Sequence, residues 1–166
     1  MADIDRVLAT VRDWKQPRRG AGKPFRLTCW LDAPVGSGEV AESWKSAAIP
    51  VDLLAFWSKA RSARLFVDAD YGQWGLALLS PARSAARTAR ERSARPDDIR
   101  SGDVVVGEFL GDQELVVLAG DSGGKVLIAL PLDRRDDWYQ AAATLGEFRD
   151  AYVRFEGAKF WESAQA

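Results

Sequence analysis

The stretch "VVVGEFLGDQELVVL", residues 104–118, decides the fold class of this chain. Two runs rich in Val and Leu flank Gly111-Asp112, and such runs around a Gly-containing turn are typical of a β-hairpin. A third apolar run follows the turn-forming segment "GDSGG" at 120–124. Turns this short join antiparallel strands, so the sequence predicts a meander with strands at 103–110, 113–119 and 125–130.

Helical and strand-like patterns fill the rest of the chain. Apolar residues at helical spacing predict helices over 3–15, 39–47, from Pro50 onward, over 81–94, and twice more after residue 132. Further strands are predicted at 25–31 and in a strand–turn–strand unit within 63–80. We therefore expect a single domain over 1–166 with an α+β fold. Its central, mainly antiparallel sheet should have about five to six strands, covered by N-terminal and C-terminal helices.

Helix ends and buried faces are also predicted from local signals. The expected N-terminal caps are Ser37, Ser80 before Pro81, Asp133, and Thr144 with Glu147 as a capping box. The expected buried stripes are Leu53, Leu54 and Trp57 in one helix, and Leu145, Phe148, Tyr152 and Phe155 in the last.

Composition narrows the possible functions. The chain has a net charge of −1, no histidine and one cysteine, Cys29. Without histidine it has no Ser-His-Asp or Cys-His nucleophile, and we expect neither a metal site nor a cofactor. The near-neutral charge gives no general attraction to nucleic acid or to anionic membranes. No apolar run is long enough to cross a membrane and no signal peptide is evident, so we expect a cytoplasmic protein.

Glu108 is the carboxylate of the opening stretch most in need of an explanation. Alternation places it between Val106 and Leu110 on a strand whose two faces are both apolar. It is either an acid in a pocket at the sheet centre or a structural Glu hydrogen-bonded to a Trp, Tyr or Arg. Glu108, Asp112 and Glu114 would face one metal ion only if the hairpin bent sharply, so metal catalysis is not expected.

Two basic features accompany this sheet pattern. Arg83, Arg87 and Arg90 share one face of the helix at 81–94, which is either a solvated face or a partner-binding signal. The Gly- and Pro-rich segment 15–26 is basic as well, and we expect residues 16–24 to form an exposed loop outside the core.

Acidic residues cluster at turns in the C-terminal part, where 101–166 holds six basic against twelve acidic residues. Turns alternate between the ends of a meander, so the 111–112 turn and the loop after 130 should share one end. The candidate partner-binding residues there are Asp112, Glu114, Asp133, Asp136 and Asp137, with Trp138 and Tyr139 close by and Trp74 on another turn. The alternative is that the acids only cap a helix and Trp138 is core.

Several blocks in order resemble the SUKH superfamily, which includes fungal cell-wall assembly regulators and bacterial immunity proteins. The most persuasive are "GEFLGD" and "LPLDRRDDWY", with "IPVDLLAFWSKA", "LFVDADYGQWGL" and "GAKFWE" around them. The resemblance covers roughly residues 38–162, and residues 1–35 do not align with it. It implies an α+β fold with a central sheet, no catalytic activity, and a protein partner that is often a toxin, frequently a nuclease.

The predicted function is therefore a non-enzymatic protein-binding domain, specifically an immunity protein that binds and neutralises a toxin, possibly a nuclease. Acidic patches suit the basic cleft of a nuclease. Two alternatives stay open: a housekeeping regulatory adaptor of the same family, and a carboxylate-dependent hydrolase that uses Glu108. The sequence does not predict the oligomeric state.

Overall fold

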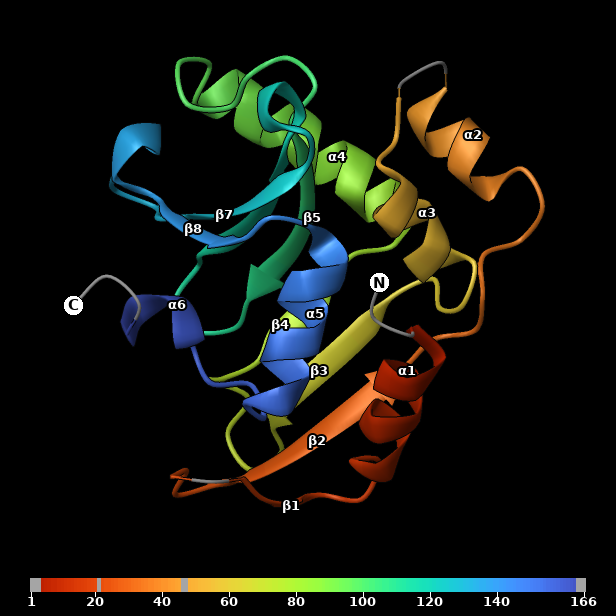
Figure 1. Cartoon of the computed structure of the whole chain (residues 1–166), viewed down its shortest axis with the longest axis vertical. Helices are drawn as coiled ribbons and strands as arrows, with labels where there is room; N and C mark the ends of the chain where they lie inside the picture. Colours follow the sequence, from red (N-terminus) through yellow and green to blue (C-terminus); the bar gives the residue numbers. More distant parts are fainter. Residues whose placement is uncertain (1–3, 21, 46–47, 164–166) are drawn as a thin grey trace.

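The computed structural model describes residues 4–20, 22–45 and 48–163. Across these residues the chain forms one sheet of eight strands in chain order, with every neighbouring pair antiparallel (Figure 1). The strands are β1 Arg18–Arg19, β2 Arg26–Leu31, β3 Ala63–Asp68, β4 Leu76–Leu78, β5 Val104–Phe109, β6 Leu115–Ala119, β7 Lys125–Ala129 and β8 Tyr139–Ala142. The predicted α+β class with an antiparallel sheet is confirmed, but the expected five to six strands were too few.

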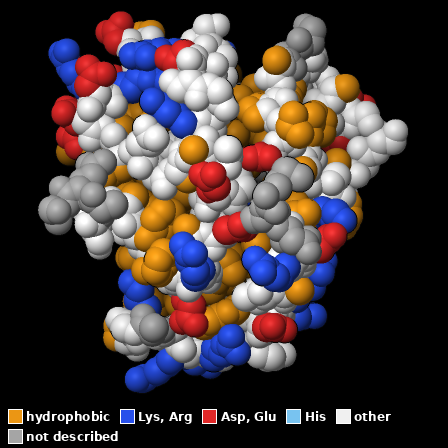
Figure 2. Space-filling model, viewed as in Figure 1, with side chains coloured by type: hydrophobic (Ala, Val, Ile, Leu, Met, Phe, Trp, Pro, Cys, Tyr) orange, Lys and Arg blue, Asp and Glu red, His pale blue; other side chains and the backbone are white. Residues whose placement is uncertain are grey.

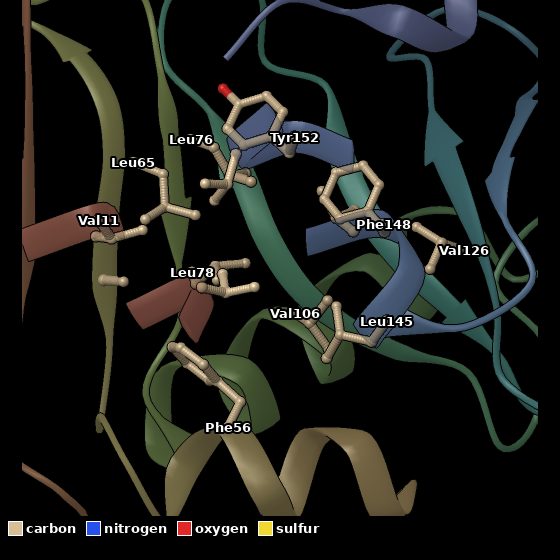
Figure 3. Packing of buried hydrophobic residues seen from close by; sticks show 14 of the residues in the cluster. Val11, Phe56, Leu65, Leu76, Leu78, Val106, Val126, Leu145, Phe148 and Tyr152 are labelled. Carbon is tan, nitrogen blue, oxygen red and sulfur yellow. The ribbon is translucent and has the colours of Figure 1, made fainter. Parts of the chain in front are cut away.

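The helices cover both faces of this sheet. They are α1 Ile4–Asp13, α2 Glu39–Trp44, α3 Val51–Trp57, α4 Pro81–Ala94, α5 Leu145–Arg154 and α6 Phe160–Ser163, with single 3-10 turns at Gly120–Ser122 and Arg135–Asp137. On one face, side chains of α1, α3 and α5 point toward the strands and form the larger core (Figure 3). Figure 1 shows α5 crossing in front of the sheet. The other face carries a smaller core, which includes Leu79, Val105, Leu127 and Trp138.

Helix α4 is fixed to this second face by buried hydroxyls. Ser84 Oγ donates to the carbonyl of Val105, and the backbone N–H of Val105 donates to Thr88 Oγ1 at 2.9 Å. Both hydroxyl side chains are buried, and they give side-chain partners to both backbone polar groups of Val105, which lies next to the bulge in the pairing of β5 with β6. The helix is thereby held in register with β5.

The predicted caps of α4 and α5 are confirmed. Ser80 Oγ accepts from the N–H of Arg83, and Thr144 Oγ1 accepts from the N–H of Glu147 at 3.1 Å. The Glu147 carboxylate in turn accepts from the N–H of Ala143. These contacts are local in sequence, which is why the sequence pattern predicts them.

Other local predictions were wrong. The cap of α2 is Gly38, with a positive φ of 80°, and not Ser37, while residues 46–47 of the predicted helix lie outside the described part. Asp133 does not begin a helix, because Arg135–Asp137 forms one 3-10 turn that leads into β8. Leu54 and Phe155 are 41% and 48% exposed, and in α3 Phe56 takes the buried place expected for Leu54.

The described residues of the segment 16–24 are exposed or half-buried, so they lie outside the core as predicted, but the segment is not only a loop. Arg18 and Arg19 form β1, which pairs with Leu27 and Arg26 of β2 at one edge of the sheet. Two adjacent arginines carry no alternating apolar pattern, so the hydrophobic periodicity of the sequence does not predict this strand. Residue 21 lies outside the described part.

Candidate functional site

Glu108 and three arginines of α4, which lie in different parts of the sequence, form one cluster in the structure: Arg83, Arg87 and Arg90. Arg83 Nη2 donates to Glu108 Oε1 at 3.0 Å, and Arg87 Nη1 donates to Oε2 at 2.5 Å. Arg87 also pairs with Glu91 one turn further along the helix. Both oxygens of the candidate catalytic carboxylate are thus held by guanidinium groups, as the structural alternative for Glu108 requires.

Glu108 nevertheless borders open space. Its side chain is 22% exposed and lines a shallow cavity of about 260 Å³ together with Leu79, Ala86 and the three arginines. A general acid or base needs a free oxygen within reach of a substrate proton. In this cluster the carboxylate is an ion-pair acceptor, and it shares the cavity wall with Arg83, Arg87 and Arg90.

The hairpin tip forms a second cluster around Lys159. Its Nζ donates to Asp112 Oδ2 at 2.6 Å and to Glu114 Oε2 at 2.7 Å. The same Nζ lies 5.7 Å from the ring centroid of Trp74, and Lys23 Nζ lies over that ring at 3.3 Å. Three predicted partner residues, Asp112, Glu114 and Trp74, are therefore brought together by a lysine that the sequence analysis did not single out.

This cluster is nearly neutral rather than acidic. Burial acts to lower the pKa of Lys159, but the hydrogen bonds to Asp112 and Glu114 outweigh it and raise that pKa above its usual value. Burial lowers the pKa of Lys23, and the nearby Lys159 charge lowers it further. Since Lys159 stays charged, it neutralises acids that were expected to attract a basic partner.

The loop 131–138 does not join that cluster. Leu115 pairs with Ala129, so the loop leaves the sheet beside the hairpin tip as predicted. It then turns back over the second sheet face, where Arg135 pairs with Asp103 at the opposite end of β5. The expected common acidic end is therefore not formed.

The remaining candidates are spread over this loop and β8. Asp133 is exposed and its carbonyl accepts from Arg95 and from the indole Nε1 of Trp138. Asp136 and Asp137 are exposed in the 3-10 turn, and the charge of Asp136 acts on Arg100 rather than on the hairpin tip. Trp138 is 6% exposed and belongs to the smaller core, as the alternative interpretation expected. Tyr139 packs against the larger core on the other face.

An apolar groove between α2 and α3 was missed by the sequence analysis. We call it the α2–α3 groove, and define it by Val40, Trp44, Ile49 and Leu54, which line a cavity of about 420 Å³. Hydrophobic side chains gather at the surface over these two helices (Figure 2). Val51 beside it is 79% exposed. The missed signal is that "IPVDLLAFW" has apolar residues on both helix faces, more than one buried stripe needs.

The other groups with catalytic potential are buried or dispersed. Burial raises the pKa of the Cys29 thiol to about 12, so this cysteine is not a thiolate at neutral pH. Within the described ranges, no three His, Cys, Asp or Glu side chains are placed to hold one metal ion. No described helix combines the length and apolar character needed to cross a membrane.

No protein-family model matches this chain, and no curated protein matches it.

Two features of the described residues bear on what this site can do chemically. The carboxylates of Glu108, Asp112 and Glu114 are engaged in ion pairs, the first with Arg83 and Arg87 and the other two with Lys159. The α2–α3 groove instead offers apolar surface, in which Leu54 is 41% exposed while Val40, Trp44 and Ile49 are half-buried against the larger core. Accessible apolar surface of this kind is typical of protein contact sites.

Proposed function

We propose that this protein is a non-enzymatic protein-binding domain, and specifically a cytoplasmic immunity protein that neutralises a toxin by binding it. The observation that carries the proposal is the α2–α3 groove. Leu54 on its wall is 41% exposed, and Val51 beside it is 79% exposed. Large apolar side chains that are left accessible together around a concavity mark protein contact sites.

Two further observations support a binder. Glu108 has both carboxylate oxygens in ion pairs with Arg83 and Arg87, which counts against its use as a general acid or base. The sequence blocks that resemble the SUKH superfamily include "IPVDLLAFWSKA", which spans α3 and thus one wall of the groove. That resemblance implies a protein partner and no catalysis.

The contact proposed here is apolar rather than acidic. Asp112 and Glu114 share Lys159, so they no longer supply a bare negative patch for the basic cleft of a nuclease. The proposed partner is accordingly a toxin that presents an apolar segment to the groove, whatever reaction that toxin catalyses.

The test is co-expression with the product of a neighbouring toxin-like reading frame. The full chain should restore the growth of cells that express the toxin, and the two purified proteins should form a stable complex in size-exclusion chromatography. Growth arrest that persists at equal expression, together with no complex between the purified proteins, would overturn the proposal.

A further inference from the structure

The outer face of β2 and β3 carries an exposed tryptophan beside an arginine. Trp30 pairs with Arg64 across these strands, Arg64 pairs with Ala77 of β4, and Ala77 pairs with Glu108 of β5. Directly paired residues project to the same side of a sheet, so these four residues form one row about 14 Å long. Trp30 is 51% exposed, which is unusual for a side chain of its size.

Helix α4 adds arginines at the Glu108 end of this row. Arg83 and Arg87 bind Glu108, and Arg90 lines the same cavity of about 260 Å³. Among the described residues, neither Arg64 nor Arg90 has an ion-pair partner. Four arginines thus face two acids, Glu108 and Glu91, and the region keeps a positive charge although the whole chain carries −1.

We infer that this face, the Trp30–arginine surface (Trp30, Arg64, Arg83, Arg87 and Arg90), binds an acidic segment of a polypeptide. Arginine can pair with carboxylates through two directed N–H groups, and Glu108 already accepts one N–H from each of Arg83 and Arg87. Arg64 and Arg90 flank that pair and have free donors for further carboxylates. Trp30 supplies apolar contact area, and Trp and Arg are the side chains most enriched at binding hot spots.

The charge distribution favours a polypeptide over a nucleic acid. The sequence pI is about 5.6, so the whole molecule does not attract a long polyanion. Glu108 and Glu91 stand among the arginines, where they would repel a continuous phosphate backbone. A short acidic segment, by contrast, can place its carboxylates beside Arg64 and Arg90 and keep them away from Glu108 and Glu91. This surface is distinct from the α2–α3 groove, so either proposal can fail while the other stands.

The test uses the full chain and a fluorescein-labelled hexaglutamate peptide, with binding followed by anisotropy at low ionic strength. The double variant Arg64→Glu/Arg90→Glu breaks no ion pair of the described residues and should weaken binding about tenfold or more. The matched control Arg12→Glu/Arg19→Glu changes the net charge equally on exposed arginines of α1 and β1 and should weaken it less than about threefold. If the Glu variant does not fold, Arg64→Gln/Arg90→Gln replaces it, with the corresponding Gln control.

Three results would overturn the inference. The first is that the wild-type chain does not bind the peptide at low ionic strength. The second is equal weakening by the two double variants. The third is tighter binding of an oligonucleotide of equal charge through the same residues. A peptide-induced NMR shift of the Trp30 indole N–H, assigned from Trp30→Phe, is the supporting result.

Discussion

Asp103 and Arg135, which are 32 positions apart in the sequence, form a buried ion pair with an N–O distance of 2.5 Å. Their side chains are 0% and 7% exposed. Asp103, which directly precedes β5, also accepts from the backbone N–H groups of Arg100 and Gly120. Its carboxylate therefore links the loop before β5, the turn after β6 and the loop 131–138. This cluster holds the loop 131–138 across the second sheet face and separates its acids from the hairpin tip.

Breaking this buried pair should lower the free energy of unfolding more than breaking any ion pair at the surface. Arg135→Met leaves the Asp103 carboxylate buried without its cation and is expected to lower the free energy of unfolding by about 3–5 kcal/mol. Urea denaturation measures this loss. Adding Asp103→Asn to Arg135→Met should recover part of it, because the uncompensated charge is removed. A loss below about 1 kcal/mol for Arg135→Met would contradict the role assigned to the pair.

Replacing Glu108 separates a structural acid from a catalytic one. Glu108→Gln weakens two charge-assisted hydrogen bonds, so the free energy of unfolding should fall by about 1–2 kcal/mol, while partner affinity stays within about tenfold. Asp97→Asn, at an exposed carboxylate of the loop after α4, is the control and should change stability little. A hydrolytic activity in the pure protein that Glu108→Gln abolishes without unfolding would instead support the hydrolase alternative.

Acid should destabilise the fold partly through Asp98. The hydrogen bond from the backbone N–H of Arg135 lowers the pKa of Asp98, and the neighbouring Arg95 lowers it further. Because the folded-state pKa lies below the ordinary value of about 3.9, the unfolded chain takes up the proton first as the pH falls. The stabilisation is thus complete at neutral pH and is lost below about pH 4. Urea denaturation at a series of pH values should show that the free energy of unfolding falls less with acid in Asp98→Asn than in the wild type. The same pH dependence in both proteins would contradict this contribution.

The parts of the fold that the sequence predicts are those with local signals. The hairpin at 104–118 has its Gly111-Asp112 turn, and α4 and α5 have their caps at Ser80 and Thr144. The edge strands β1 and β8 were missed because their short sequences, "RR" and "YQAA", have no alternating apolar pattern. They become strands only because a neighbouring strand offers backbone partners.

The candidate site was harder to predict because its contacts are distant in sequence. Lys159 reaches Asp112 from 47 positions away, and Arg83 reaches Glu108 from 25. The loop 131–138 leaves the sheet at the predicted end, but the ion pair between Arg135 and Asp103 holds it over the second sheet face. Turn alternation gives the end at which a loop starts, but long-range ion pairs decide where its side chains finish.

The central claim is that the α2–α3 groove binds a protein partner, and one affinity comparison tests it most directly. The dissociation constant of the complex with the neighbouring toxin-like protein should be measured by calorimetry for the wild type, Leu54→Glu and Leu132→Glu. Leu132 is the matched control, since it is also an exposed leucine, 97% accessible, on the distant loop 131–138. Leu54→Glu should weaken the complex at least about tenfold, and Leu132→Glu should leave it unchanged. Equal affinities for all three proteins would contradict the claim.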